Sequence, residues 1–474
     1  MSKPILSAAV MGATLALAAC TGLEAHYRQP PLPVVDAWPI PPESTDGVAA
    51  DIGWREFFGD PHLRTLIDQA LANNRDLRVA VASVRKARAL YQVQRAARLP
   101  EVDATGAFTR ERVSPVQLGL PATGSGETVQ YASAGLGIAN FEFDLFGRVA
   151  SLSHAAYQQY LAESEARRAT QLTLIAEVAN AYLTIAADTE HERLGASTLE
   201  SQEASYHLTD QRHTLGAASA LELSQARTTV ESARADAARY AGAVAIDKNA
   251  LTLLVGAPID PSLYPDALPA DVGNLKPLPA GLPSSVLLRR PDVREAEHTL
   301  RGADATIGAA RAAFFPSISL TGNFGSTSAD LSGLFKSGTG TWAFAPQVTL
   351  PIFAAGKLRA NLHSAKADRD IALAQYERAI QAAFRDVADA LAQTSSLHQQ
   401  LEAEQSLATA SGTAFSLSDA RYKAGKDSYL SLLDAQRSDY AARQTLITTR
   451  LAEQSNRVTL YKVLGGGWRA DSAP

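Results

Sequence analysis

Residues 421–425, with the sequence Arg-Tyr-Lys-Ala-Gly, repeat residues 212–216, Arg-His-Thr-Leu-Gly, at an offset of 209 positions. The same offset aligns residues 178–181, Val-Ala-Asn-Ala, with residues 387–390, Val-Ala-Asp-Ala. A duplicated unit of this length is far longer than the repeats of solenoid proteins. The sequence therefore predicts two structurally similar halves, which we place at residues 60–266 and 275–468.

Long stretches without proline surround both copies of this motif. Residues 122–257 and 352–473 contain no Pro. We predict a helix from Arg148 to about His213, which would be about 100 Å long, and its counterpart from about Lys357 to Tyr422. Helices this long bury an apolar stripe only against other helices, so we expect coiled-coil packing.

A glycine ends each copy of the motif. Glycine adopts the left-handed conformation that terminates many helices at little cost. Gly216 and Gly425 are therefore expected where each long helix reverses into a second one, which gives two helical hairpins.

Each half also contains a shorter helix and two strands. Apolar residues recur at intervals of three and four from Asp60 until Pro100, which predicts one amphipathic helix. Alternating residues predict strands at about 102–109, 131–145, 317–324 and 342–350, and the second of these loses its phase near Asn140. The Gly-, Ser- and Thr-rich segments 111–130 and 325–341 are predicted loops.

The strands are about ten residues long, apolar on one face and polar on the other, as in membrane β-barrels. Four strands cannot close a barrel, and an open sheet edge is not tolerated in lipid. Two, three or four copies of the chain would supply 8, 12 or 16 strands. Periodicity alone does not choose among these numbers, nor between a membrane barrel and a soluble β-meander that caps helices.

The N-terminus has the features of an export signal. One lysine precedes an apolar run at residues 5–19, which is too short to span a bilayer but fits a signal peptide. The run ends in Leu-Ala-Ala-Cys at residues 17–20, so we predict a lipoprotein signal peptide at residues 1–19 and lipidation of Cys20. Residues 20–59 would then be a lipid-anchored, proline-rich segment. An ordinary signal peptide with a chance Cys is the alternative.

Composition excludes several classes of protein. The 474 residues include 49 acidic and 44 basic side chains, a balance that argues against a nucleic-acid partner. A single Cys excludes an intrachain disulfide framework and a Cys-cluster metal site. We found no phosphate-binding loop, nucleophile elbow or zinc motif. We therefore predict no enzyme activity, no catalytic residues, no cofactor and no metal.

Several longer motifs resemble those of one known family, the TolC-like outer-membrane factors, in the lipoprotein branch that includes OprM and NodT. The most specific stretch joins Leu-Arg-Arg-Pro-Asp-Val-Arg at 288–294 with Ile-Gly-Ala-Ala-Arg at 307–311 and Phe-Phe-Pro-Ser-Ile-Ser-Leu at 314–320. Further matches are residues 66–73, 141–148, 350–353 and 432–436. The resemblance covers almost the whole chain after the signal.

This resemblance implies a mainly α fold with a membrane β part. It implies a homotrimer with a shared 12-stranded β-barrel and a long periplasmic α-helical barrel built of coiled-coil hairpins. The protein would be the outer-membrane channel of a tripartite efflux system in a Gram-negative bacterium. It would be a passive exit duct for drugs or other small toxic compounds, docked to a periplasmic adaptor and an inner-membrane RND transporter. Its lipid anchor would lie in the outer membrane, with the helices extending into the periplasm.

The resemblance also implies two sets of site residues. Leu430, Asp434 and Arg437 would narrow the periplasmic end of the duct as a gate. The alternative for the two charged residues is an ordinary exposed pair three positions apart on one helix.

The hairpin tips, Gly216 with Ala217 and Gly425 with Lys426, would contact the adaptor, although each could also be a purely structural turn. Residues 289–292, Arg-Arg-Pro-Asp, are interpreted as a helix start rather than a basic site.

Two other functions remain open. One is an exit duct for type I protein secretion. The other is a lipid-anchored periplasmic coiled-coil scaffold without a pore. The transported substrate cannot be identified from the sequence.

Overall fold

The computed structural model describes residues 23–24, 27–35, 52–114, 116, 126–272 and 284–466. The chain forms two compact units. The first, which we call the strand unit, combines Met1–Pro30, Val84–Glu163 and Glu295–Tyr376. The second, the hairpin unit, combines Pro31–Ser83, Ser164–Arg294 and Glu377–Pro474.

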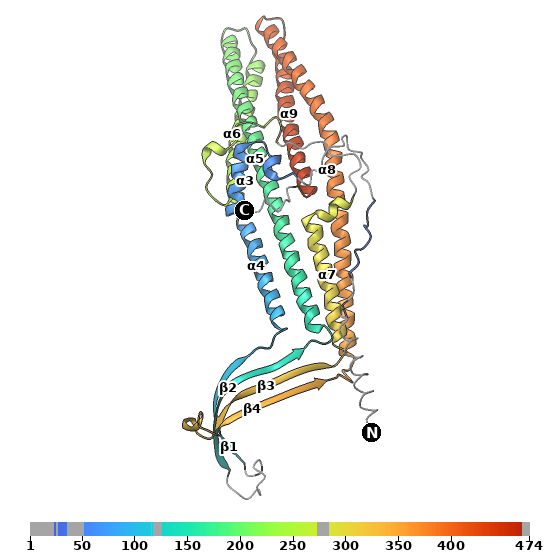
Figure 1. The fold of residues 1–474 in the computed structure, drawn as a ribbon. Coiled ribbons are helices and arrows are strands. Elements are labelled where there is room, and N and C mark those ends of the chain that lie inside the picture. The colour runs from blue at the N-terminus through green and yellow to red at the C-terminus, as the bar shows by residue number, and fades with distance from the viewer. Residues whose placement is uncertain are drawn as a thin grey trace. The chain divides into compact units, whose positions relative to one another are not determined.

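The strand unit is built on an antiparallel sheet of four strands in the order β1-β2-β3-β4 (Figure 1). The strands are β1 (Asp103–Val113), β2 (Glu127–Phe143), β3 (Ser317–Ser328) and β4 (Gly340–Thr349). In this sheet β1 and β4 are the edge strands. Each half of the sequence supplies two neighbouring strands, as predicted.

Apolar side chains form rows across one face of this sheet. The pairing places Leu136 opposite Phe324, and Phe324 opposite Trp342. All three side chains are more than half exposed in the single chain. Alternation along each strand keeps such residues on the same face, so the sheet presents an apolar surface that the chain itself does not cover.

The strands differ in two respects from a regular ladder. Asn140 has a positive φ of 56°, and the pairing of β2 with β3 shifts between Ile138 and Phe141, which confirms the predicted loss of phase. The predicted loops were too long, because β1 ends at Val113, β2 begins at Glu127 and β3 continues to Ser328. Backbone pairing continues β3 into a segment whose Gly-, Ser- and Thr-rich composition suggested a turn.

Two helical hairpins form most of the hairpin unit, and their elements are visible in Figure 1. The first consists of α5 (Arg148–Thr214) and α6 (Ala220–Val255), and the second of α8 (Lys357–Lys423) and α9 (Tyr429–Val463). The helices α5 and α8 have 67 residues each. Their first residues lie 209 positions apart, as do those of α6 and α9. The two predicted long helices are therefore confirmed to within about one residue.

The predicted single helix from Asp60 to Pro100 is wrong in one respect. It is divided into α3 (Pro61–Asn73) and α4 (Arg75–Ala96). The side chain of Asn74 accepts a hydrogen bond from the Leu77 amide at 2.9 Å and donates one to the Leu254 carbonyl at 2.8 Å. The bond from the Leu77 amide caps the start of a new helix, and the bond to Leu254 joins this point to α6 (Ala220–Val255). In the equivalent place in the second half, α7 (Pro291–Ala312) follows a 3-10 turn at Ser284–Arg289.

The core of the hairpin unit brings together the short helix α2 (Trp54–Phe57), the last turns of α9, α3 and the middle of α5. Phe57, from α2, stacks on Tyr461 of α9 with ring centroids 4.1 Å apart. The Tyr461 hydroxyl donates to the Ile52 carbonyl at 3.0 Å. Further core residues come from α3 and the middle of α5, among them Leu63, Leu66, Ile67, Val178, Tyr182 and Leu183.

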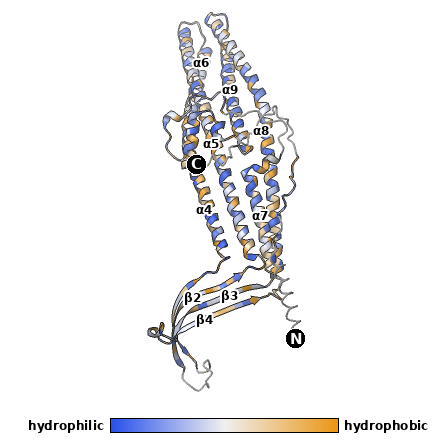
Figure 2. Ribbon diagram, viewed as in Figure 1, coloured by the Kyte–Doolittle hydropathy of each residue, from blue (hydrophilic) through white to orange (hydrophobic). Residues whose placement is uncertain are grey.

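Hydrophilic residues are distributed along all the long helices (Figure 2). Within the described ranges, no helix combines the length and apolar composition expected of a membrane span.

Candidate functional site

Both hairpins reverse through the same kind of turn. Gly216 and Gly425 have φ values of 75° and 69°. In each turn the amide of the next residue, Ala217 or Lys426, donates to a carbonyl five residues earlier, at 2.7 and 2.9 Å. This is the helix-ending motif that favours glycine in the left-handed position. The sequence therefore predicted both turns and the residue on which each depends.

The second turn carries an ion pair that the first lacks. Arg421 forms two bonds to the Asp427 carboxylate, at 2.5 and 2.9 Å. The guanidinium holds the pKa of Asp427 below its usual range. At the aligned position of the first turn stands Ala218, so this pair belongs to one hairpin tip only. Sequence reasoning missed it, although the aligned comparison of the two tips contains the signal.

The predicted gate residues lie together on α9, directly after the second turn. Leu430, Asp434 and Arg437 are spaced by four and three residues, which places them on one helix face. All three are exposed, and Leu430 is 62% exposed. Within the described chain Asp434 and Arg437 form no ion pair with each other.

An adjacent, buried face of α9 joins this helix to α8 and α6. Tyr429, Leu432 and Leu433 are buried and cluster with Tyr422 of α8 and Ala226 of α6. Tyr422 and Tyr429 pack edge to face, with ring centroids 5.7 Å apart. Burial fixes the rotation of α9 about its axis, and with it the direction of the face that carries Leu430.

The first hairpin presents the same face with different chemistry. Leu221 aligns with Leu430 and is 67% exposed, but Gln225 and Thr228 stand where the second hairpin has Asp434 and Arg437. The first hairpin therefore repeats the apolar element of this face without its charges.

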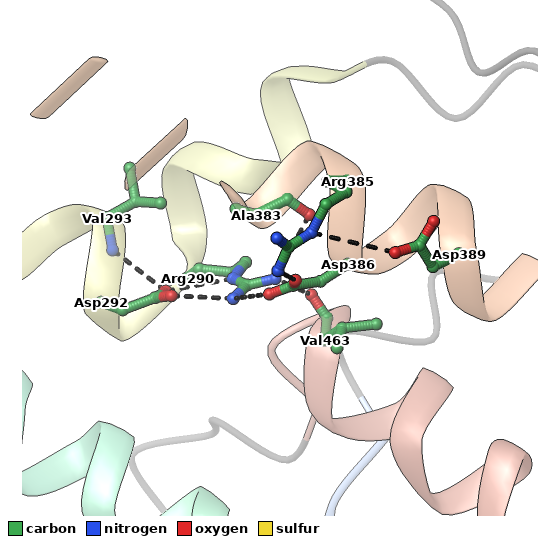
Figure 3. Close-up of polar contacts among 8 residues, drawn as sticks. All are labelled: Arg290, Asp292, Val293, Ala383, Arg385, Asp386, Asp389 and Val463. Atoms are coloured by element: carbon green, nitrogen blue, oxygen red, sulfur yellow. Dashed lines mark hydrogen bonds and ion pairs between the residues drawn. The ribbon is translucent and has the colours of Figure 1, made fainter. Parts of the chain in front are cut away.

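A buried arginine joins three helices at the base of the second hairpin (Figure 3). Arg290 is 8% exposed and forms a bidentate pair with Asp292, at 2.7 and 3.0 Å. It also donates to the Val463 carbonyl at 3.0 Å and lies 3.4 Å from the Asp386 carboxylate and the Ala383 carbonyl.

This arrangement explains the residue types at 290–292. Pro291 begins α7, and the Asp292 carboxylate accepts from the Val293 amide at 3.0 Å, as predicted for a helix start. Val463 is the last residue of α9, whose terminal carbonyls lack partners within the helix. Arg290 therefore caps the end of α9, a role that the local sequence did not indicate.

Two carboxyl groups meet between α5 and α6. Burial, followed by the hydrogen bond and charge of Asp188, raises the pKa of Asp247 to about 6. Nearby, His191 stacks on Tyr240 with ring centroids 4.7 Å apart, and burial lowers its pKa. These groups pack between helices, and the part of the chain that the structure describes contains no cluster suited to a metal.

The predicted lipidation residue, Cys20, lies outside the described residues, so its role stays a prediction. The gate and tip assignments likewise remain predictions, because the single chain shows where these residues lie but not what they contact in an assembly.

Comparison with known proteins connects this geometry to a family. A model of the outer membrane efflux protein family matches residues 66–257 and 282–466. The chain is 48% identical to the antibiotic efflux pump outer membrane protein ArpC of Pseudomonas putida. It has the same identity to the toluene efflux pump outer membrane protein TtgC of that species. Each of these alignments covers 99% of this chain and 96% of the relative.

A solved structure has the same fold. The chain matches the MtrE outer membrane channel of Neisseria gonorrhoeae in its open state, with a TM-score of 0.83 and 40% identity. This match covers 94% of this chain and 98% of that one.

Proposed function

The chain belongs to the outer membrane efflux protein family, and we propose that it forms a passive exit duct through the outer membrane for small toxic compounds. The observation that carries this proposal is the combination of two features in one chain. A four-stranded sheet with two edge strands accompanies two hairpins whose longer helices have 67 residues each. Efflux, not catalysis, characterises the family.

We propose that three copies share their strands in a 12-stranded barrel, with the hairpins forming a helical barrel in the periplasm. An unpaired strand edge in lipid costs several kcal/mol for each backbone group left without a partner. The edge strands β1 and β4 would find partners in neighbouring copies. The exposed row of Leu136, Phe324 and Trp342 suits contact with acyl chains. The two repeats would extend over residues 60–266 and 275–468.

The assembly is tested by the mass of the detergent-solubilised protein and by its resistance to heat in SDS. A heat-resistant species of three chains supports the proposal. A monomer that becomes water-soluble after delipidation would instead support the periplasmic scaffold without a pore.

The proposed gate consists of Leu430, Asp434 and Arg437. Their common face is exposed, and its charges are unpaired with each other in the single chain, which favours contacts between copies over the ordinary pair within one helix. We expect an Asp434→Ala, Arg437→Ala double variant to conduct more ions than the wild type. Gln225→Ala with Thr228→Ala in the first hairpin is the matched control and should leave conductance unchanged. Equal conductance in all three proteins would refute the gate.

The hairpin tips are the proposed contacts of a periplasmic adaptor, which would link the duct to an inner-membrane RND transporter. A photo-crosslinking residue at Ala217 or Lys426 should capture the adaptor in cells. The same residue at Gln405, which is exposed but lies within α8, is the control. Crosslinks from Gln405 alone, in an active complex, would refute docking at the tips.

We propose that Cys20 carries the lipid anchor. A mature N-terminal peptide with the mass of an acylated cysteine would establish it. We expect Cys20→Ser to impair sorting and assembly more than conduction, because the shared barrel would also hold the protein in the membrane. A fully assembled Cys20→Ser trimer that does not conduct would contradict this expectation.

The names of the relatives indicate the class of cargo only broadly. Two proteins with equal identity to this chain are named for antibiotic and for toluene efflux. We therefore propose small toxic organic compounds as the cargo. Export of a polypeptide in a reconstituted type I system would overturn this assignment in favour of a secretion duct.

A further inference from the structure

The edge strand β1 changes character along one face of the sheet. Pairing with β2 and the alternation of side chains place five of its residues on the same face as Leu136: Ala104, Gly106, Phe108, Arg110 and Arg112. Phe108 is 55% exposed, and both arginines are exposed. This face of β1 therefore passes from apolar to cationic within two residues, or about 7 Å along the strand.

The acidic residues of the same segment lie on the opposite face of the sheet. Glu111 stands between the two arginines in the sequence, and Glu127 is the first residue of β2. The pairing register places both glutamates on the face away from Arg110 and Arg112. Residues 113–126, which join the two strands, contain no acidic side chain. Charges of opposite sign are thus separated onto the two faces of the sheet.

One carboxylate binds to the face that carries the arginines. Asp330, in the connection between β3 and β4, accepts a hydrogen bond from the Gln130 amide at 2.9 Å. Gln130 pairs with Arg110 across the sheet. Neither Arg110 nor Arg112 forms an ion pair with Asp330 or with any other residue that the structure describes. Two positive charges therefore outnumber one negative charge at this end of the face.

The boundary between apolar and polar residues crosses this face at an angle. One row of directly paired residues consists of Ala104, Leu136, Phe324 and Trp342. On β4 the apolar residues end in this row, because the next residue of the face is Gly340, whereas on β1 they continue for four positions to Phe108. Four residues extend about 14 Å, and the three strand spacings from β4 to β1 also add to about 14 Å. The boundary is therefore inclined to the rows by about 45°, which matches the strand tilt of membrane barrels.

The inclined boundary indicates where the lipid would end. The chain enters β1 from α4 at Asp103, so Arg110 and Arg112 lie at the end of the strand away from that helix. With the helices in the periplasm, as proposed above, this end reaches the outer leaflet. A lipid-facing charge is costly at the middle of a bilayer, but the cost nearly vanishes at its surface. Both arginines therefore lie at the level of lipid headgroups.

We propose that Arg110 and Arg112 bind the phosphate groups of an anionic glycolipid in the outer leaflet, whose acyl chains contact Phe108 and the apolar rows. The proposal rests on the shared barrel proposed above. A guanidinium binds a phosphate through two parallel hydrogen bonds, which makes arginine better suited to this ligand than lysine. Because β1 is an edge strand, each site would lie beside the junction between two copies, which gives three sites in a trimer.

The site is tested by titrating the full-length, detergent-solubilised protein with lipid A, a glucosamine lipid that carries two phosphates. Native mass spectrometry counts the bound lipids, and the wild-type trimer should bind up to three. Arg110→Gln with Arg112→Gln should weaken binding about 10-fold, as expected for the loss of two exposed ion pairs. Replacement of both arginines by lysine keeps the charges but not the paired hydrogen bonds, and should weaken binding only about 3-fold.

The matched control removes two neighbouring exposed arginines from α4. Arg85→Gln with Arg88→Gln changes the net charge equally, and its affinity should stay within about 2-fold of the wild type. Equal affinities of the two glutamine double variants would overturn the site.

A second comparison changes the lipid and uses only the wild-type protein, so it applies even if the arginine variants do not assemble. Lipid A should bind about 10-fold more tightly than the same lipid without its phosphates. Equal affinity for the two lipids would overturn the role of the phosphates. An excess of inorganic phosphate, compared with chloride at the same ionic strength, should leave lipid A bound. Complete displacement would show that the site takes a free anion instead of a lipid.

The outcomes separate this site from the proposed duct. A heat-resistant trimer without preference for the phosphorylated lipid would overturn the site and leave the duct intact. A chain that forms no trimer would overturn both proposals, because the site depends on the barrel.

Discussion

At the scale of single residues, Arg290 shows how much a local motif leaves undetermined. The sequence around it predicted a helix start, and α7 does begin at Pro291. The guanidinium, however, also binds carbonyls of α8 and α9 that lie 93 and 173 positions away in the chain. Such partners cannot be inferred from the neighbours of a residue in the sequence. The ion pair of Arg421 and Asp427 was missed for a different reason, because only one of the two repeats contains it.

Replacement of Arg290 by Met should be strongly destabilising. Methionine keeps much of the side-chain volume but removes the donor to the Val463 carbonyl and the guanidinium that pairs with Asp292 and Asp386. Asp386 retains its bond from Arg385, and Asp292 retains its bond from the Val293 amide. We expect a loss of about 2–4 kcal/mol in the free energy of unfolding, measured by denaturant titration of the helical circular-dichroism signal. Arg378→Met, at an exposed position of α8, is the control. A loss no greater than that of Arg378→Met would contradict the capping role.

The pair of Asp247 and Asp188 predicts a pH dependence of stability. Folded Asp247 retains its proton up to about pH 6, whereas an unfolded aspartate releases it near pH 4. The contribution of this group to stability is therefore complete below about pH 4 and is lost as the pH rises through 6. Asp247→Asn stays uncharged, so its melting temperature should exceed that of the wild type more at pH 7.5 than at pH 4.5.

The control for this prediction is Asp210→Asn, which removes one carboxylate elsewhere on α5. The buried His191 also titrates, but it is present in all three proteins. Its effect on the pH dependence of the melting temperature therefore cancels in the comparison. A difference in melting temperature between Asp247→Asn and the wild type that does not change with pH would show that the two carboxyl groups do not share a proton.

At the scale of elements, the sequence predicted the long helices better than the short ones. The absence of proline allows α5 and α8 to be long, and the turns at Gly216 and Gly425 mark where they end. The break at Asn74 could not be predicted, because apolar residues keep their helical spacing on both sides of it. It depends on a bond to the Leu254 carbonyl, 180 positions away. The strands β1, β2 and β3 are longer than predicted, because pairing with a neighbouring strand stabilises even a Gly- and Ser-rich segment.

Asn74→Ala tests the cause of that break. The variant loses a helix-capping bond and the bond to Leu254, so the free energy of unfolding should fall by about 1–2 kcal/mol. Asn73→Ala is the control, since that side chain bonds only to Gln69 within its own helix. Equal stability of the two variants would mean that the polar contacts of Asn74 do not hold α4 to α6.

At the scale of the whole molecule, the two repeats explain both the symmetry of the chain and its departures from symmetry. Each repeat supplies two strands and one hairpin, yet only the second hairpin has the Asp434 and Arg437 charges and the Arg421–Asp427 pair. The fold of one chain follows from its pattern of prolines, glycines and apolar residues. The number of copies does not, because four strands are compatible with several closed assemblies.

The central claim is that assembled copies of this chain form a duct whose periplasmic end is narrowed by the face carrying Leu430, Asp434 and Arg437. The most direct measurement is the single-channel conductance of the purified protein in a planar lipid bilayer. We predict small conductance steps for the wild type and steps several-fold larger for the Asp434→Ala, Arg437→Ala double variant. A heat-resistant trimer that inserts into the bilayer but gives no conductance steps in either form would contradict the account.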